Sequence, residues 1–289
     1  MNSAVFLGLA TVDLVYEVER LPRENEKGVA RRQEILCGGP AANAAITCAF
    51  LGAPVKFAGV IGRHALTSVI REEFARLGVA LHDLSPEANE APSISSIFVN
   101  PRTGSRTIVS GHATRQQVPA CAFDRAVLEG AGLLMVDGHQ MACAIAAAAE
   151  AKKKGIPAVL DGGSWKQGTE ELLAQTEVAI CAEAFRPPGT EALGHVIDYL
   201  LARGVRHAAV TRGADSILWA SGSERGEVAV PSTNANDTLG AGDIFHGAFC
   251  RRMLAGAAFV DALAFAASVA SYSCRFFGTR AWMQEWHDH

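Results

Sequence analysis

A glycine-rich segment near the end of the chain carries the residue types that phosphate chemistry requires. Residues 236–243 read NDTLGAGD and lead into an apolar pattern typical of a helix. Gly240, Ala241 and Gly242 lack bulk, so the backbone can point successive N–H groups at one anion, and the helix N-terminus adds about half a positive charge. Asp243 lies at the same junction as a potential base. Phosphoryl transfer requires both donors for the transferring group and a base beside the attacking hydroxyl.

An isolated turn of this kind has a structural explanation that is more frequent. The glycines would then form a simple turn, and Asp243 would cap the helix that follows. The preceding pair Asp237-Thr238, together with the pattern of the rest of the chain, shifts the balance toward the chemical interpretation.

A second polar group lies near the start of the chain. Gly38 and Gly39 precede an alanine-rich helical pattern that carries Asn43 in its first turn. Glycines let a flat ligand approach the backbone, and an Asn amide both donates to and accepts from hydroxyl groups. Asp13 follows the first predicted strand, where open α/β sheets bind their ligands. For each polar residue alone, a structural role is more frequent: helix capping for Asn43 and turn formation for Asp13.

These groups must be positioned by an alternation of strands and helices. Short apolar runs predict buried strands at Val5–Ala10, Lys56–Ile61, Gly132–Val136, Ala158–Leu160, Val178–Cys181 and Ala208–Thr211. Helical patterns cover Ala41–Leu51, Thr67–Leu77, Ala142–Lys154, Glu191–Arg203 and Ala241–Leu254. This order predicts an α/β fold in three layers, α/β/α, with a mainly parallel central sheet covered by helices on both faces.

Two stretches depart from this alternation. Residues 14–36 and 93–109 show strand-like patterns without helices, and Pro22, Gly28 and residues 102–105 provide their turns. We expect them to form a small β-sheet that projects from a single domain spanning residues 1–289. Such a sheet could act as a lid over a cleft.

The composition argues against several classes of partner. The net charge is −4, so the chain has no basic field for a nucleic acid or an anionic membrane. The first residues indicate a buried strand rather than a signal peptide, and no apolar run reaches the ~18 residues of a membrane span. The seven cysteines form no CxxC pair and no zinc-type spacing. We interpret them as reduced, mostly buried side chains of a cytoplasmic protein.

Two of these segments resemble the signatures of a known family. DTLGAGD at 237–243 is similar to the second signature of the ribokinase-like (PfkB-type) sugar kinases, and CGGPAAN at 37–43 is similar to the first. Their order and spacing match over essentially the whole chain. The resemblance implies a ribokinase-like fold and ATP-dependent phosphorylation of a sugar hydroxyl. It makes Asp243 the catalytic base and the amides of Gly240–Asp243 the anion hole.

The resemblance also assigns a sugar site. By position in the motifs, Asp13, Gly38, Gly39 and Asn43 would be sugar ligands. A ketohexokinase-like or sulfofructose-kinase-like branch is favoured by residues 104–109, which read GSRTIV. The substrate would then be a ketose or a modified ketose.

Charged and titratable residues in or near the expected lid are further candidates for the substrate site. Lys27 and Arg106 could contact the sugar, although solvated charges are at least as frequent at such positions. The segment that begins at Leu21-Pro22 leads to Lys27 and supports the same branch. His112 and His139 could also reach the substrate.

The nucleotide side is assigned by the same resemblance. Family members have a Thr-x-Gly-x-x-Gly loop that contacts the nucleotide, and this chain keeps Thr211 and Gly213 but has Ser216 in place of the last glycine. Ser271 lies on a late helix that resembles the wall of the adenine pocket. Lys166, which follows another predicted strand, could bind a phosphate or face solvent.

The expected cofactors are ATP and Mg²⁺, and a monovalent cation such as K⁺ is a further option. Many family members organise Mg²⁺ with an Asn-x-x-Glu motif, but the corresponding residues 182–185 read AEAF. Glu183 could substitute, or ATP phosphates and water could hold most of the Mg²⁺ coordination sphere. The metal ligands therefore stay unassigned. The resemblance also implies a homodimer formed through the lid sheet, whose exposed edges favour pairing.

Two alternative functions compete with a sugar kinase. A nucleoside kinase on the same scaffold would need an aromatic slot for the base, and Phe98 is the only aromatic residue of the second lid stretch. A sugar sensor without catalysis would bind its ligand without turnover. The intact Asp243 motif argues against the sensor, whereas the missing Asn-x-x-Glu motif argues mildly for it.

Overall fold

A nine-stranded sheet forms the centre of the molecule, and the computed structural model describes residues 2–111 and 117–287. Its strands are in the order β13-β12-β11-β10-β9-β8-β1-β4-β5. All neighbours pair in parallel except β11 with β12 and β12 with β13. The strands are β1 (Ser3–Leu7), β4 (Val55–Gly59), β5 (Val79–Asp83), β8 (Ala131–Val136), β9 (Ala158–Gly162), β10 (Val178–Ala182), β11 (His207–Arg212), β12 (Asp215–Ser221) and β13 (Glu224–Val228).

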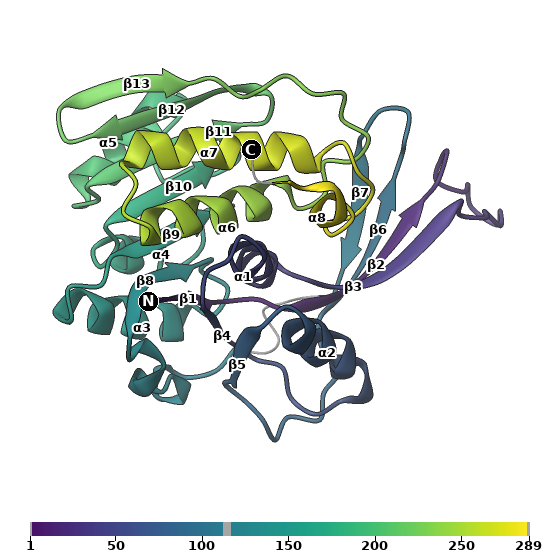
Figure 1. Cartoon of the computed structure of the whole chain (residues 1–289), viewed down its shortest axis with the longest axis horizontal. Helices are drawn as coiled ribbons and strands as arrows, with labels where there is room; N and C mark the ends of the chain where they lie inside the picture. Colours follow the sequence, from purple (N-terminus) through teal and green to yellow (C-terminus); the bar gives the residue numbers. More distant parts are fainter. Residues whose placement is uncertain (1, 112–116, 288–289) are drawn as a thin grey trace.

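Helices cover both faces of this sheet, as the alternation in the sequence predicted (Figure 1). One face carries α1 (Pro40–Phe50), α2 (Ser68–Arg76), α6 (Ala241–Leu254), α7 (Phe259–Ser273) and α8 (Trp282–Glu285). The other carries α3 (Met141–Lys153), α4 (Thr169–Leu173) and α5 (Leu193–Ala202). Short 3₁₀ turns occur at η1 (Ala65–Thr67), η3 (Ala120–Ala122) and η4 (Arg125–Leu128).

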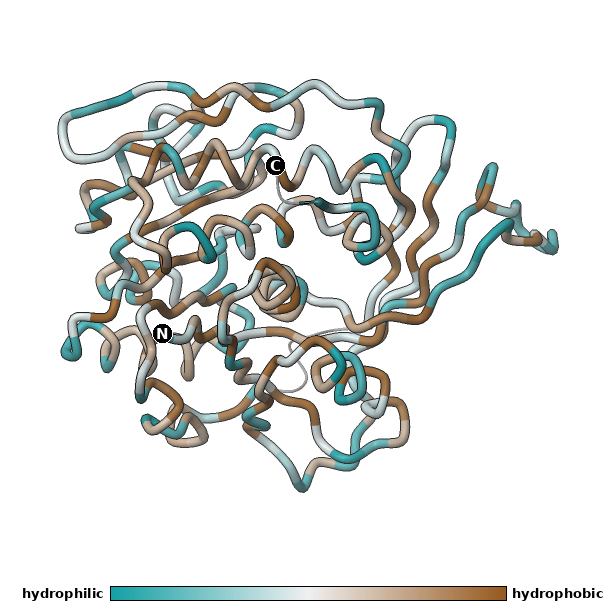
Figure 2. The backbone as a smooth tube through the Cα atoms, in the orientation of Figure 1, coloured by the Kyte–Doolittle hydropathy of each residue, from teal (hydrophilic) through white to brown (hydrophobic). Residues whose placement is uncertain are grey.

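The central strands are apolar because both of their faces are buried. In β1, Ala4 and Phe6 pack into the core on the α1 and α6 side, whereas Val5 and Leu7 pack into the core on the α3 side. Alternate residues therefore face opposite helix layers, which requires a near-continuous apolar run. Figure 2 shows this hydrophobic interior beside the hydrophilic outer loops.

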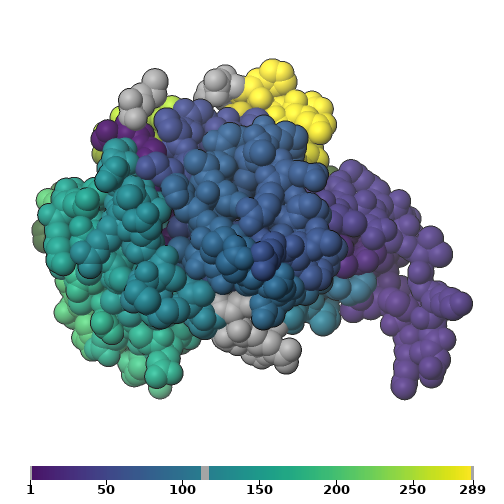
Figure 3. Space-filling model, turned by 90° about the horizontal axis from the view of Figure 1, so that it is seen from below, coloured from purple at the N-terminus to yellow at the C-terminus, as the bar shows by residue number. Residues whose placement is uncertain are grey.

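A separate four-stranded sheet projects from the domain (Figures 1 and 3). Its order is β3-β2-β6-β7, built from β2 (Thr11–Glu17), β3 (Arg32–Gly38), β6 (Ile94–Val99) and β7 (Arg106–Ser110). We call it the lid sheet. Val15, Ile97 and Val99 on its inner face pack with Leu239 and Phe277, so the sheet is anchored beside the glycine-rich turn.

The boundaries differ from the sequence expectations in several places. The first strand ends at Leu7 rather than Ala10, so the lid sheet begins at Thr11 instead of residue 14. The short strand β5 and the antiparallel edge strands β12 and β13 were not among the predicted strands. His112 lies outside the described residues. Within the described part of the chain, no helix has the length and apolar character needed to cross a membrane.

Helices α1 and α6 approach each other closely where a glycine takes part in the contact. A Cβ added to Gly247 would lie 2.4 Å from the carbonyl oxygen of Ala44. Gly247 therefore permits a helix separation that a larger residue would prevent. Because Asn43 lies on α1 and Asp243 on α6, this separation also fixes the distance between the two side chains.

We expect Gly247→Ala to destabilise the fold by about 1–3 kcal/mol, since α1 and α6 must move apart to accept the methyl group. Gly194→Ala in α5 is the matched control. Its new Cβ meets no atom within 4 Å, and the helical position gains up to about 1 kcal/mol from the added alanine. Urea unfolding measures both changes. Equal stability effects in the two variants would contradict the close-packing argument.

Candidate active site

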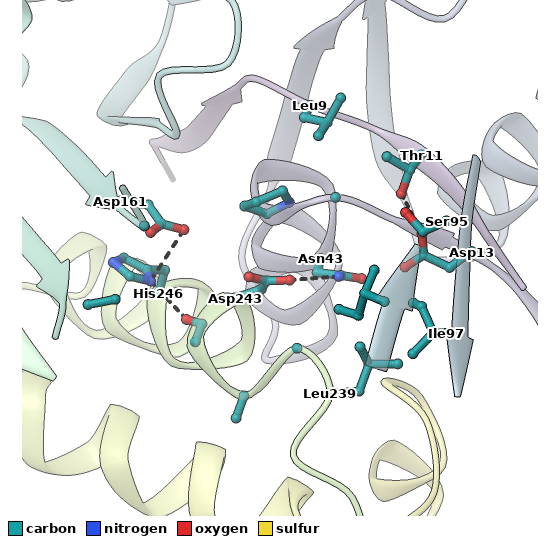
Figure 4. A pocket seen from close by; sticks show the side chains of 18 of the residues that line it. Leu9, Thr11, Asp13, Asn43, Ser95, Ile97, Asp161, Leu239, Asp243 and His246 are labelled. Carbon is teal, nitrogen blue, oxygen red and sulfur yellow. Dashed lines mark hydrogen bonds and ion pairs between the residues drawn. The ribbon is translucent and has the colours of Figure 1, made fainter. Parts of the chain in front are cut away.

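A cavity of about 370 Å³ lies between the carboxyl ends of the central strands and the inner face of the lid sheet (Figure 4). This volume is in the range of small-molecule sites. The central domain contributes Leu9, Gly39, Pro40, Asn43, Asp161, Gly163, Ala182 and Thr211 to its lining. The lid sheet contributes Thr11, Asp13, Ser95, Ile97, Arg106 and Ile108, and the glycine-rich segment and α6 contribute Leu239–Asp243 and His246.

The glycine-rich turn forms the start of α6 as predicted. Gly240 is the N-cap residue and has a φ of 67°, a left-handed conformation that glycine adopts without strain. The N–H groups of Gly242 and Asp243 fall in the first helical turn, where the helix itself provides no acceptors. The N–H of Ala241 is 3.4 Å from the carbonyl oxygen of Thr238, a long hydrogen bond that an anion could replace.

Asp237 holds this turn in place from behind. Its Oδ1 accepts from the N–H of Leu239 at 2.8 Å, and its Oδ2 accepts from the N–H of Gly278 at 2.8 Å. The Asp237 side chain is 2% exposed, so the signature residue supports the loop and does not face the cavity. Arg106 of the lid sheet donates to Oγ1 of the adjacent Thr238 at 2.8 Å. The lid and the turn are therefore joined directly.

Asp243 faces the cavity from the first turn of α6. Burial, followed by the nearby charge of Asp161, raises the pKa of this carboxyl group to about 7. A hydrogen bond of 2.8 Å from Nδ2 of Asn43 to Oδ2 of Asp243 acts in the opposite direction, as does His246. A carboxyl group with a pKa near 7 is suited to general-base catalysis at neutral pH.

A contact between His246 and Asp161 that the sequence did not predict lies at one end of the cavity. Nδ1 of His246 is 3.6 Å from Oδ2 of Asp161 and 2.8 Å from the carbonyl oxygen of Gly242. Its Nε2 lies 3.3 Å from the carbonyl oxygen of Ile180. These contacts hold the imidazole ring beside Asp161 at this end of the cavity. His246 could have been recognised from the sequence, because it follows Asp243 by three residues and therefore lies on the same helix face.

Asp13 lies at the other end of the cavity (Figure 4). The sequence suggested a residue just after the first strand or in a turn, but Asp13 lies inside β2, paired in register with Ser95. Its Oδ1 accepts from Oγ1 of Thr11 at 2.6 Å. Burial raises the pKa of Asp13, and hydrogen bonds from Thr11 and Ser95 oppose that effect.

Gly38 and Gly39 serve this end of the cavity in different ways. A Cβ at Gly38 would lie 1.9 Å from Oδ2 of Asp13, so the glycine leaves room for that carboxylate and does not itself line the cavity. Gly39 lines the cavity as the N-cap residue of α1. Asn43 therefore does not cap its helix. It connects Asp243 to Arg280, a residue that the sequence analysis did not single out.

Several candidates lie away from the cavity lining. Lys27 is exposed in the loop between β2 and β3, Gly213 is in the turn between β11 and β12, and Ser271 is buried within α7. Nζ of Lys166 is 3.4 Å from the carbonyl oxygen of Asp137, outside the lining. Thr211 does line the cavity.

The loop after β8 lies outside the cavity lining and holds neighbouring backbone segments in place. Asp137 is 2% exposed, and its Oδ2 accepts from the N–H groups of Leu9 at 2.9 Å and Ala41 at 3.1 Å. His139 donates its backbone N–H to Oδ1 of the same carboxylate at 2.9 Å. The carboxylate thus joins the turn after β1 to the start of α1, and neither Asp137 nor His139 lines the cavity.

The described residues contain no group of three or more His, Cys, Asp or Glu side chains arranged to hold a metal ion. Glu183, the residue that could have replaced the missing motif, is exposed outside the cavity lining. The carboxylates that line the cavity are those of Asp13, Asp161 and Asp243. This donor set fits an Mg²⁺ ion that keeps most of its ligands from phosphate and water.

Comparison with known proteins agrees with these features. The model of the pfkB family carbohydrate kinases matches residues 1–286. Ribokinase of Arabidopsis thaliana is 28% identical over 282 residues, covering 92% of this chain and 74% of that protein. Ketohexokinase of Mus musculus is 22% identical over 282 residues, covering 93% of this chain and 94% of that protein.

The fold is also similar to that of solved ribokinase structures. The structure of Arabidopsis thaliana ribokinase complexed with ribose and ATP matches with a TM-score of 0.75 and 25% identity, covering 96% of this chain and 94% of that chain. The family match extends over nearly the whole sequence, and the three-layer fold with its small separate sheet accompanies it. The chain therefore belongs to the pfkB family of carbohydrate kinases, as its two signatures predicted.

Proposed function

We propose that this kinase transfers the γ-phosphate of ATP to a hydroxyl group of a sugar, with Asp243 as the general base. One observation carries the proposal: Asp243 and the first N–H groups of α6 face the same cavity as Asp13 and Asn43. A sugar held by Asp13 would lie within the cavity that Asp243 also lines. The triphosphate would approach along the glycine-rich turn, where the N-terminus of α6 favours negative charge.

The chemical step follows from this arrangement. The ionised Asp243 accepts the proton of the attacking hydroxyl while the oxygen forms a bond to the γ-phosphorus and the bond to ADP breaks. The N–H groups of Gly240–Asp243 donate to the phosphoryl oxygens as negative charge moves over them. The lid sheet, joined to Thr238 through Arg106, limits the access of water that would otherwise hydrolyse ATP.

Mg²⁺ would neutralise charge on the triphosphate and would be held mainly by phosphate oxygens and water. Asp161 is the carboxylate of this chain that could accept hydrogen bonds from its water ligands. The other nucleotide contacts that we propose are Thr211 and Gly213 near the end of β11, with Lys166 and Ser271 farther from the cavity. A requirement for a monovalent cation stays a prediction.

The lining favours a sugar over a nucleoside. Within the part of the chain that the structure describes, no Phe, Tyr or Trp side chain lines the cavity. Phe98 stacks on Tyr16 with ring centroids 5.5 Å apart, and its neighbour Ile97 takes the inward position on β6. A nucleobase would therefore find no aromatic surface there, whereas Asp13, Thr11 and Ser95 offer oxygens that suit sugar hydroxyls. We propose a ketose or modified ketose as the acceptor.

The outer face of the lid sheet supports the proposal of a homodimer. The cross-strand pairing puts Ile35, Leu14, Ser96 and Val109 in one row on the face opposite the cavity. Ile35 on β3 is 53% exposed and Val109 on β7 is 65% exposed, so both edge strands present an apolar side chain on this face. A second copy of the lid sheet would cover them.

Asp243→Asn should lower kcat by roughly 10²–10⁴, because the amide keeps the shape of the carboxylate but cannot accept the proton. ATP binding should persist, since the backbone N–H groups are unchanged. An ADP-release assay over a panel of ketoses, aldoses and nucleosides gives kcat, and calorimetry gives ATP affinity. Near-normal kcat in the variant would exclude Asp243 as the base. Sugar binding without ADP release in the unmodified protein would indicate a sensor.

The pH profile of kcat/KM tests the environment of Asp243. Only the carboxylate form can act as base, so kcat/KM should fall about tenfold per pH unit below a pKa near 7. Asp161→Asn removes a charge that raises this pKa, so the acidic limb should move to lower pH. Asp261→Asn, an exposed change on α7, is the matched control. An acidic limb that stays in place in Asp161→Asn would refute the electrostatic coupling.

Val109→Lys should convert the dimer to a monomer in sedimentation experiments, because a charge would be buried in the proposed interface. Leu66→Lys is a control of similar type, since Leu66 is 41% exposed and lies away from the lid sheet. A monomeric unmodified protein, or a dimer that tolerates Val109→Lys, would rule out assembly through this face.

A further inference from the structure

A buried arginine from the last part of the chain contacts the residue that holds Asp243. Arg280 follows α7 and is 9% exposed. Its Nη2 donates to Oδ1 of Asn43 at 3.0 Å and to the carbonyl oxygen of Cys37 at 2.8 Å. Its Nε donates to Oε1 of Glu73 at 2.6 Å. The proposed phosphoryl transfer assigns no role to Arg280 or to Glu73.

Glu73 keeps the guanidinium group in one orientation. It lies in α2, is 7% exposed, and its second oxygen, Oε2, accepts from the N–H of Cys37 at 2.8 Å. Nη1 of Arg280 donates in turn to Oγ1 of Thr279 at 2.8 Å. A buried arginine is costly unless it is paired and its donors are satisfied. These contacts meet that requirement and leave the planar group little freedom to rotate.

The fixed guanidinium determines which way the amide of Asn43 points. Arginine only donates hydrogen bonds, so the oxygen of the Asn43 amide must face Arg280. The NH₂ group must then face Asp243, where Nδ2 lies 2.8 Å from Oδ2. The flipped amide would place an oxygen against the carboxylate and an NH₂ group against the guanidinium, which would oppose like groups at both contacts.

We propose that Arg280 is a positioning residue that locks the Asn43 amide so that its NH₂ group always donates to Asp243. One oxygen of the base is thereby held, and the other is left for the acceptor hydroxyl. Arg280 does not line the cavity, so it acts through Asn43 rather than on the substrate. The proposal rests on the proposed function, because it concerns Asp243 in its role as the base.

The same arrangement has an electrostatic consequence. The hydrogen bond from Asn43 lowers the pKa of Asp243, and His246 of α6 acts in the same direction. Burial, Asp161 at the end of β9 and Asp13 of β2 all raise it. Loss of the locked amide should therefore leave more of the base protonated at a given pH.

The test compares two arginines that contact the same glutamate. In Arg280→Met, the acidic limb of kcat/KM should move up by about one pH unit, the scale of one hydrogen bond to a charged group. Arg76→Met should leave the limb in place, because Arg76 is 67% exposed and lies 3.6 Å from Glu73 without reaching Asn43. Arg280→Lys keeps the charge, so its acidic limb should lie between those of Arg280→Met and the unmodified protein. An Arg280→Met profile that coincides with the unmodified protein would overturn the proposal.

Two further measurements cover a variant that fails to fold and separate the role of Arg280 from the proposed function. If Arg280→Met does not fold, Arg280→Met combined with Glu73→Gln removes both buried charges, and the same upward shift is expected in that variant. An unchanged limb there would also overturn the proposal. Asp243→Asn separates the two claims: if it retains turnover, the proposed function fails, and if it loses turnover while the Arg280 variants keep the original limb, only the role of Arg280 fails.

Discussion

One hydrogen bond between two helices determines the geometry of the site. Nδ2 of Asn43 on α1 donates to Oδ2 of Asp243 on α6 at 2.8 Å, and both residues lie in the first turn of their helices. The bond forms across the close packing of α1 and α6 at Gly247. The two signatures of the family, which lie about 200 residues apart, meet at this contact.

Three buried carboxyl groups line the cavity, and each has a neighbouring group that favours its charged form. Asp243, Asp161 and Asp13 all face one space, and burial raises the pKa of each. Asp161 is offset by His246, Asp13 by the hydroxyls of Thr11 and Ser95, and Asp243 by Asn43. Of the three, Asp243 also lies at a helix N-terminus, where the N–H groups favour an anion. A phosphoryl group and its base can therefore share one small region.

The sequence predicted the parts of the fold and site that depend on local pattern. Buried parallel strands appear as short apolar runs, and the turn at Gly240 appears as glycines followed by a helical pattern. The roles of Arg280, Glu73 and Asp161 could not be predicted, because each depends on partners far away in the chain and each would pass for an ordinary core ion pair. Asp13 was expected just after the first strand for a related reason: only the pairing of Thr11 with Gly38 of β3 shows that residue 11 begins a strand of the lid sheet.

A structure with a sugar and a non-hydrolysable ATP analogue bound would test the central claim most directly. We expect an acceptor hydroxyl to lie within hydrogen-bond distance of Asp243, about 2.6–3.2 Å from a carboxylate oxygen. We also expect the terminal phosphate to accept from the N–H groups of Gly242 and Asp243. A sugar hydroxyl bound away from Asp243, or a terminal phosphate bound elsewhere than at the start of α6, would contradict the role of Asp243 as the base.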